Sequence, residues 1–335
     1  DIEALVYDKL VDEGQRLTAK AYEDSRSVRE YQREYINTTD DQLHELLDGV
    51  SEYWNTENSN KDATVVTVQR DYMAGIINTD LTMRGLLPPD VVEAHREGIL
   101  HFHDADYFAQ NALTNCCLIN LEDMLQNGTC INKVKIFKPH RLITAATIAT
   151  QIITAVTSSQ YGGATITLTH LAPFVRDSYN RYLDKYRSWG LTKEQCEVFA
   201  KRDLKKEVTD AVQTFNYQVN SMTTTNGQSP FLSVCMYLGE TDEYKEELAM
   251  LIEEFLKQRI EGMPNRQGVF VTPAFPKLLY VLEEDNIHED SPYFYLTKLA
   301  AKCTAKRLVP DYISEKVMKR LKIDKNGNGQ AYPCM

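Results

Sequence analysis

The sequence predicts an α/β protein that begins with a helical region. After about residue 95, short apolar runs typical of buried strands alternate with longer segments in which apolar residues recur every three or four positions. This alternation is typical of parallel α/β folds. Before residue 95 the chain is polar and shows only the helical period. We therefore divide the chain into residues 1–95, a helical region, and residues 96–335, an α/β region.

The helical region contains three predicted helices. Residues 1–25 have apolar side chains at helical spacing, and so does a second segment whose first turn Thr39 or Asp40 would cap. A third helix starts at a proline pair and stops at Gly98, after which the chain is expected to become extended.

The α/β region supplies the remaining elements in order. A glycine-containing turn is predicted between the first two of its helices. The predicted helices cover residues 140–156, 171–190, 204–222 and 244–263. The predicted strands cover residues 112–120 and 230–238, and residues 268–282 predict a strand followed by a helix.

Composition narrows the classes of function. The chain has 335 residues, is 43% hydrophobic and carries a formal net charge of −11, which argues against nucleic acid as a partner. No run approaches the roughly 18 apolar residues of a membrane span, and the start does not read as a signal peptide, so we expect a cytoplasmic protein without a membrane partner. The first residue is Asp1 and the last run, NGNGQAYPCM, breaks off in a turn-rich stretch, so we expect a segment of a longer chain.

Seven cysteines occur without a C-x-x-C pair, which supports neither a disulfide framework nor a zinc knuckle. His101 and His103 would share one strand face, but spacing supplies no third and fourth ligand, so a structural pair is favoured over a metal site. Cys116 and Cys117 are adjacent in a predicted strand and would face opposite sides. Only one of these two thiols can therefore point into a given pocket.

Two polar turns are candidates for binding phosphate or sugar. TSSQYGGAT at 157–165 and TTTNGQSPF at 223–231 combine hydroxyls, amides and glycines beside element ends. Neither matches a Walker loop or a dinucleotide fingerprint, and composition alone favours ordinary turns. The candidate substrate-binding residues in them are Ser158, Ser159, Gln160, Gly162, Gly163, Asn226, Gly227 and Gln228.

Four ordered segments carry a family resemblance. They are HFHDADYFAQNALTNCCLINLEDML, VTSSQYGGATI, TTTNGQSPF and FVTPAFPKLLYVLEEDN. Across roughly residues 65–335, the chain resembles the catalytic subunit of the anaerobic, glycyl-radical (class III) ribonucleoside-triphosphate reductases. The resemblance implies a ten-stranded α/β barrel made of two antiparallel halves, each of five parallel strands. This chain would hold the first half and the helices of a dimer interface.

The resemblance gives the adjacent cysteines different roles. Cys116, which follows Asn115, matches the family's active-site cysteine on the first barrel strand, and Cys117 becomes its buried neighbour. Removing the 2′-hydroxyl of ribose requires abstraction of the 3′-hydrogen by a radical, loss of the protonated hydroxyl as water, and delivery of hydrogen to carbon. A thiol donates hydrogen atoms readily, so Cys116 is expected to act on the 2′ side. Asn115 and the polar turns would orient the ribonucleoside triphosphate.

The resemblance also implies groups that these residues do not include. The family's thiyl-bearing cysteine would fall two positions beyond Met335, with Cys334 as its neighbour. A glycyl radical, installed by a radical-SAM iron–sulfur activase, and a cysteine-ligated zinc module would lie further on. We therefore expect this segment alone to be inactive. Formate and a protein dithiol both stay open as the reductant, and an ATP-cone before Asp1 stays open as well.

Regulation is implied too. The family binds deoxynucleoside triphosphate or ATP effectors between helices of two subunits, so a homodimer is expected. Arg181 and Lys185 lie four residues apart on one face of a predicted helix, where two cations could hold a triphosphate beside Tyr182 or Tyr186. A solvated helix face is the simpler interpretation of the same two cations.

Three other classes share parts of the pattern. Pyruvate formate-lyase-like enzymes have the barrel and the glycyl radical, but their adjacent cysteines sit late in the chain, whereas Cys116 and Cys117 precede the second barrel strand. A non-catalytic nucleotide-binding regulator would suit a short chain. A vitamin-B12-dependent reductase is a more distant relative with a similar barrel.

Overall fold

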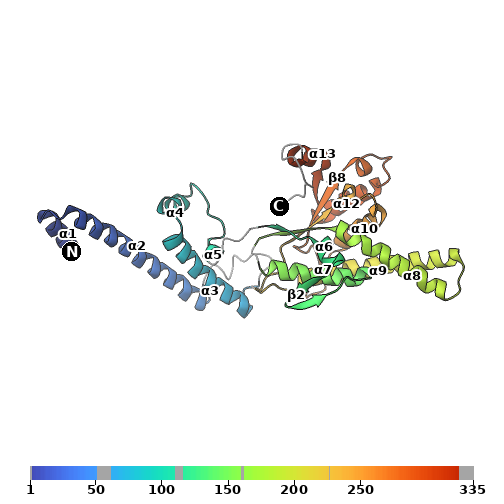
Figure 1. The fold of residues 1–335 in the computed structure, drawn as a ribbon, viewed down its shortest axis with the longest axis horizontal. Helices are drawn as coiled ribbons and strands as arrows, with labels where there is room; N and C mark the ends of the chain where they lie inside the picture. The colour runs from blue at the N-terminus through green and yellow to red at the C-terminus, as the bar shows by residue number, and fades with distance from the viewer. Residues whose placement is uncertain (1, 51–61, 110–115, 160–161, 226, 324–335) are drawn as a thin grey trace. The chain divides into compact units, whose positions relative to one another are not determined.

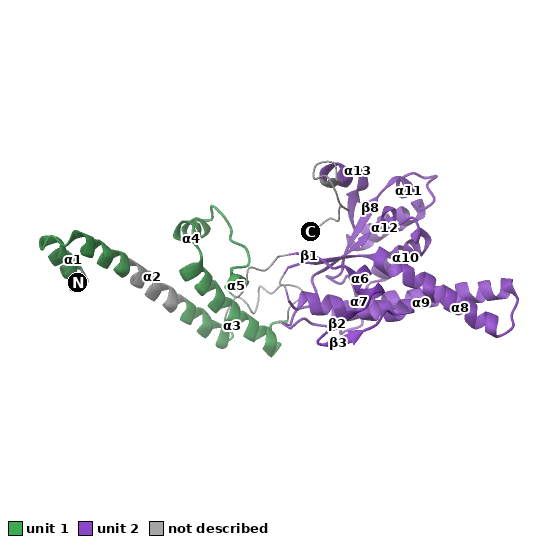
Figure 2. Ribbon diagram, viewed as in Figure 1, with its two compact units in different colours: residues 1–58, 62–113 green, residues 59–61, 114–335 purple. Residues whose placement is uncertain are grey.

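The computed structural model describes residues 2–50, 62–109, 116–159, 162–225 and 227–323 (Figure 1). The chain forms two compact units, which Figure 2 distinguishes by colour. The first unit contains residues 1–58 and 62–113, and the second contains residues 59–61 and 114–335. The division into a helical region, residues 1–95, and an α/β region, residues 96–335, stays a prediction.

The first unit is helical throughout its described elements. These are α1 (Ile2–Asp12), α2 (Arg16–Leu47), α3 (Val66–Leu81), the π-helix η2 (Thr82–Leu86), α4 (Pro89–Arg96) and α5 (Ala105–Phe108). Because α2 runs through Thr39 and Asp40 without interruption, the predicted helix start there is wrong. Residues 16–38 contain no glycine or proline that would stop the helix before this point. Gly98, with φ +73°, follows the end of α4 as expected.

The histidine segment after α4 forms a turn and a short helix, so the expected strand is absent there. His103 pairs with Asp104, which has φ +60° and begins α5 without a side-chain cap. The His101 ring centroid lies 5.3 Å from that of His95 and 5.6 Å from that of His103. His101 and His103 therefore lie close together because the chain turns between them, and they do not share a strand face.

The second unit is built around a parallel sheet. The strands of this larger sheet have the order β1 (Cys117–Leu118), β4 (Ala164–Thr167), β5 (Leu232–Met236), β8 (Lys277–Leu282) and β9 (Asp311–Ser314), and every neighbouring pair is parallel. Two small antiparallel pairs accompany it, β2 (Thr129–Ile131) with β3 (Val134–Ile136) and β6 (Met263–Pro264) with β7 (Phe270–Val271). This five-stranded parallel sheet confirms the predicted α/β fold class.

Helices connect the strands of this sheet. The longer ones are α7 (Leu142–Thr157), α8 (Ala172–Ser188), α9 (Lys193–Ser221), α10 (Lys245–Glu261) and α12 (Phe294–Arg307). The shorter ones are α6 (Leu121–Gln126), η3 (Leu168–Leu171), η4 (Leu238–Glu240), α11 (Glu284–Ile287), α13 (Glu315–Met318) and η5 (Lys319–Ile323). None of the described helices combines the length and the apolar composition needed to cross a membrane.

Two strands lie where other structure was predicted. β4 occupies part of the segment expected to be only a turn between two helices, and β8 occupies the KLLYVL run expected to be a helix. All four residues of β4 are buried, as are the four central residues of β8. A strand that is covered on both faces shows no alternation of apolar and polar residues, so its period cannot separate it from a buried helix.

The two faces of the sheet pack against different partners. One face carries Ala164, Ile166, Leu232, Val234, Met236, Leu278 and Tyr280, which join a continuous apolar core with residues of α7, α8, α9, α10 and α12. On the other face, Cys235 and Val281 pack with Met318, Tyr237 and Ile313. Strand alternation therefore separates a helix-covered face from a second, more polar face.

A buried carboxylate joins three helices of the covering layer. Glu207 on α9, only 4% exposed, accepts hydrogen bonds from Arg141 Nη2 at 3.1 Å, Ser178 Oγ at 3.1 Å and the Ile143 backbone N–H at 3.3 Å. Ser178 on α8 also accepts from the Leu142 N–H at 2.9 Å. Burial opposes ionisation, but the hydrogen bonds, that of Arg141 foremost, outweigh it and lower the pKa of Glu207. The start of α7 is thereby anchored to α8 and α9.

Glu207→Gln should lower the free energy of unfolding by about 2 kcal/mol at pH 7, because the charge-assisted bond to Arg141 is lost. The pKa of Glu207 is lower in the folded than in the unfolded chain. Its ionised form therefore stabilises the fold above the unfolded pKa of about 4.3, and this contribution disappears as pH falls through the folded value. Urea unfolding at neutral and acid pH measures the difference, which should shrink in acid.

Asp210→Asn is the matched control, because Asp210 lies on the same helix with an exposed side chain. It should change stability by less than about 0.5 kcal/mol. Equal losses in the two variants would contradict the assignment of the buried network.

Candidate active site at the amino edge of the sheet

Three segments that are distant in sequence meet where the strands begin. Cys116, Gly163 and Phe231 directly precede β1, β4 and β5, respectively. These strands are parallel neighbours whose first residues are in register, so the three residues lie side by side at the amino edge. The Cys117 N–H donates to the Gly163 carbonyl at 3.0 Å, and the Ala164 N–H donates to the Phe231 carbonyl at 2.8 Å.

The two adjacent thiols are both half-buried at this edge. Cys117 is the first residue of β1 and packs against the apolar core of the helix-covered face. Leu118, the next residue along the strand, is 52% exposed. Alternation places Cys116, on the other side of Cys117, toward the second face of the sheet. Which thiol acts in the reaction stays a prediction.

The two polar turns predicted to bind substrate contact each other. The Thr225 N–H donates to Ser158 Oγ at 3.3 Å, and Thr225 Oγ1 donates to the Ser158 carbonyl at 3.4 Å. Gly227 adopts φ +78°, and its N–H donates to the Thr224 carbonyl at 3.0 Å. The carbonyl of Gln228, a residue only 8% exposed, accepts from the Thr224 N–H at 2.8 Å. The structure thus brings both turns together beside the sheet edge.

The remaining predicted substrate residues are only partly described. Ser159 Oγ donates to the Ala155 carbonyl at 3.3 Å, so its hydroxyl closes the end of α7. Gly162 is half-buried. Three predicted residues lie outside the described residues: Asn115, Gln160 and Asn226.

An aromatic side chain explains the glycine at position 163. A Cβ on Gly163 would lie 2.9 Å from Cδ1 and 3.1 Å from Cε1 of Phe231. The Phe231 ring packs on Phe275, with centroids 4.7 Å apart, and Lys277 Nζ lies 5.0 Å from the Phe231 centroid. The sequence assigned no role to these three side chains. The signals that the sequence offered were two segments, TTTNGQSPF, which ends at Phe231, and FVTPAFPKLLYVLEEDN, which contains Phe275 and Lys277.

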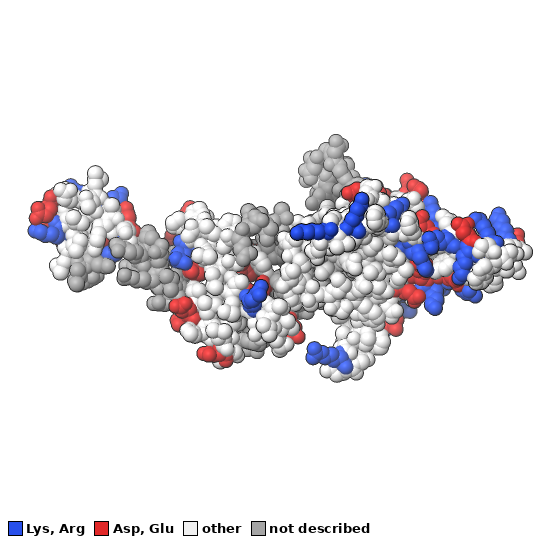
Figure 3. Space-filling model, turned by 60° about the horizontal axis from the view of Figure 1, so that its bottom comes forward, with Lys and Arg blue, Asp and Glu red and all other residues white. Residues whose placement is uncertain are grey.

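The predicted effector residues lie on α8. Lys185 Nζ is 3.9 Å from the Asp203 carboxylate, 5.0 Å from the Tyr186 ring centroid and 5.1 Å from the Trp189 ring centroid. Arg181 is exposed and has no ion pair within the described residues. On the face shown in Figure 3, charged side chains of both signs gather toward the end of the second unit where α8 and α9 lie.

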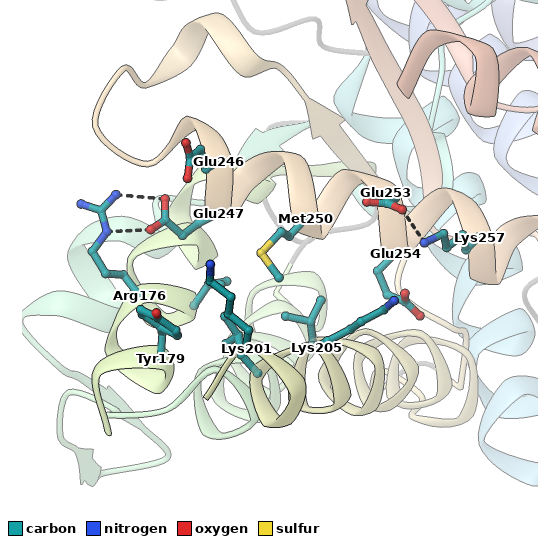
Figure 4. A pocket seen from close by; sticks show the side chains of 13 residues that line it. Arg176, Tyr179, Lys201, Lys205, Glu246, Glu247, Met250, Glu253, Glu254 and Lys257 are labelled. Carbon is teal, nitrogen blue, oxygen red and sulfur yellow. Dashed lines mark hydrogen bonds and ion pairs between the residues drawn. The ribbon is translucent and has the colours of Figure 1, made fainter. Parts of the chain in front are cut away.

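A cavity of about 550 Å³ lies between α8, α9 and α10 (Figure 4). Its apolar lining comes from Val175, Leu204, Val208 and Met250. Arg176 on its rim donates to both Glu247 oxygens, at 2.6 and 3.0 Å, and Lys257 pairs with Glu253. Its described lining contains no thiol, and several of its charges are already paired. Within the described ranges, no cluster of three His, Cys, Asp or Glu side chains could hold a metal ion.

Gly163→Ala should displace the Phe231 ring and lower the free energy of unfolding by about 1–3 kcal/mol. When Phe231 is already replaced by alanine, the same change should have a much smaller effect, because the obstructing ring is gone. Gly85→Ala is the control, since no atom lies within 4 Å of its added Cβ. Additive effects in a double-mutant cycle of Gly163→Ala and Phe231→Ala would exclude the proposed contact.

Comparisons with known proteins agree with this architecture. Residues 57–335 match the family model of the anaerobic ribonucleoside-triphosphate reductase. Reductases of that name from Haemophilus influenzae and Enterobacteria phage T4 are 34% identical over 316 residues and 36% identical over 263 residues, respectively. These alignments cover 93% and 78% of this chain but only 43% and 42% of the relatives.

Solved structures show the same fold. The anaerobic ribonucleotide reductase from Thermotoga maritima in complex with dATP and CTP superimposes with a TM-score of 0.56 at 15% identity, over 88% of this chain and 50% of that chain. The same enzyme with dATP bound in the specificity site gives a TM-score of 0.52. The chain thus spans about half the length of the proteins it matches, and it belongs to the anaerobic ribonucleoside-triphosphate reductase family.

Proposed function

We propose that this chain forms the first half of the catalytic barrel of an enzyme that reduces ribonucleoside triphosphates to deoxyribonucleoside triphosphates. The observation that carries the proposal is the convergence of Cys116 and the two polar turns at one edge of the parallel sheet. Family membership supplies the class of reaction. The arrangement supplies a thiol beside hydroxyl and backbone groups that suit a sugar phosphate.

In this proposal the ribose lies at the amino edge with its 2′ carbon toward Cys116. Hydroxyls and backbone N–H groups of the turns at Ser158 and Gln228 hold sugar or phosphate oxygens. The net reaction replaces the 2′-hydroxyl with hydrogen and releases water, so it consumes two electrons and two protons, one proton for the leaving hydroxyl and one for the new C–H bond. Cys116 delivers hydrogen to the 2′ carbon, and formate or a protein dithiol supplies the equivalents that restore the thiol.

The radical that starts the reaction belongs to the part of the reductases that this chain does not span. A glycyl radical, installed by a radical-SAM iron–sulfur activase, supplies the chemistry that removes the 3′-hydrogen. A cysteine-ligated zinc module is proposed for the same part. Activity is therefore expected of the full-length protein with its activase, and the segment alone is proposed to be inactive.

Cys116→Ser in the full-length, activated protein should abolish ribonucleotide reduction, because a serine hydroxyl is a far poorer hydrogen-atom donor than a thiol. The glycyl radical should still form and is measured by electron paramagnetic resonance. Cys117→Ser is the matched control and should keep most of the activity, since its side chain packs toward the apolar core. Similar losses of activity in the two variants would defeat the assignment of faces.

We further propose that α8 contributes to a deoxynucleotide effector site in a homodimer. The support is the exposed Arg181 and the position of Lys185 beside the Tyr186 and Trp189 rings, where a phosphate and a base could be held together. The Asp203 carboxylate, 3.9 Å from Lys185, competes with a phosphate for that cation. Arg181 is therefore the stronger candidate for phosphate binding.

Arg181→Ala and Lys185→Ala should each weaken deoxynucleotide binding by about three- to tenfold, because a charge-assisted contact to phosphate is lost. Added salt should weaken wild-type binding as well, since exposed cations are screened. Arg187→Ala is the control, because Arg187 pairs with Asp184 at 3.1 Å on the same helix. Wild-type affinity together with a wild-type monomer–dimer equilibrium in both test variants would remove α8 from the effector site.

A further inference from the structure

Lys277 is a cation at the amino edge to which the proposed reaction gives no role. It begins β8, and its Nζ lies 5.0 Å from the Phe231 ring centroid. In the part of the chain that the structure describes, Lys277 forms no ion pair. A cation over an aromatic ring gains about 0.5–1 kcal/mol from the ring. The ring offers no hydrogen-bond acceptor to the three N–H donors of the ammonium group. This ammonium group is therefore able to bind an anion.

Strand register places Lys277 on the same face of the sheet as Cys116. Leu118 pairs with Thr165, Thr165 with Ser233, and Ser233 with Lys277. Side chains in register point to the same face, and Cys116 lies two residues before Leu118 along the strand direction. Three strand spacings, roughly 14 Å, separate the two backbones. The long lysine side chain shortens this separation by reaching over β5 to Phe231.

The Phe231 ring sets the position of the ammonium group. One edge of the ring fills the space that a Cβ on Gly163 would need, and its face carries Lys277. Packing on Phe275 fixes the ring from a third side. The ammonium group of Lys277 is thereby held over β5. It lies between β8, which Lys277 begins, and the starts of β1 and β4, which Cys116 and Gly163 precede.

We propose that Lys277 binds an oxyanion in the site at Cys116. This inference rests on the proposed function for the role of the thiol. The ligand group is a phosphate or a carboxylate, and two sources fit. An extended nucleoside triphosphate is long enough to reach from the first strand to the fourth, and a small carboxylate reductant must approach the same thiol.

Equilibrium titration of the full-length protein with inorganic triphosphate and, separately, with acetate tests the proposal. Lys277→Gln should weaken binding of one probe about tenfold, which corresponds to about 1.4 kcal/mol. Lys277→Arg keeps the charge and should retain affinity within about threefold. A selective loss for triphosphate identifies the phosphate source, and a selective loss for acetate identifies the carboxylate source.

Lys298 offers a matched control, because its Nζ lies 4.9 Å from the Phe294 ring on α12. Lys298→Gln removes the same kind of ring contact elsewhere and should leave both affinities unchanged. If Lys277→Gln, in a folded protein, binds both probes as the wild type does, or if the wild type binds neither, the proposal is overturned. The titrations measure binding without turnover. A negative result for Lys277 can therefore be distinguished from a failure of the proposed function, which would appear as activity retained in Cys116→Ser.

Discussion

The close approach of Phe231 to Gly163 is the constraint on which the candidate site depends. Because Gly163 has no side chain, the ring can lie against β4 while the backbone before β4 hydrogen-bonds to both neighbours. The Gly163 carbonyl fixes the start of β1 through Cys117, and Ala164 fixes the start of β5 through the Phe231 carbonyl. The absence of a side chain at Gly163 therefore allows β1, β4 and β5 to begin side by side. This arrangement determines the position of the Cys116 thiol.

The helix layer fixes the polar turns relative to that edge. Glu207 on α9 holds the first turn of α7 through Ile143 and Arg141. At the other end of α7, Ser158 contacts Thr225, which follows the end of α9. Because hydrogen bonds join α7 and α9 at both ends, the helices cannot slide along each other. The positions of the two polar turns relative to each other are thereby fixed. The binding groups of the proposed site thus depend on a buried carboxylate distant from them.

The parts of the fold that could be predicted are those with a strong local signal. The long helices α7 and α10 have a clear period, and α9 was predicted only from residue 204, whereas it begins at Lys193 behind the Thr192–Gln195 capping box. The strands β4 and β8 are short and buried, so no local period identifies them. The same limit applies to the site. Cys116 stood out by its sequence, whereas the contacts among Gly163, Phe231 and Lys277 join residues that only the strand register brings together.

Charge differs between the two ends of the sheet. At the carboxyl end, burial and the neighbouring Glu315 raise the pKa of Glu283 to about 7, although Lys319, 2.7 Å from Glu315, offsets part of this negative charge. Lys277 stands at the amino end of β8, the strand that Glu283 follows. As pH rises through about 7, Glu283 loses its proton and the carboxyl end becomes more negative. The carboxyl end of β8 thus becomes less favourable for an anion as pH rises, whereas the amino end of the same strand carries the cation Lys277.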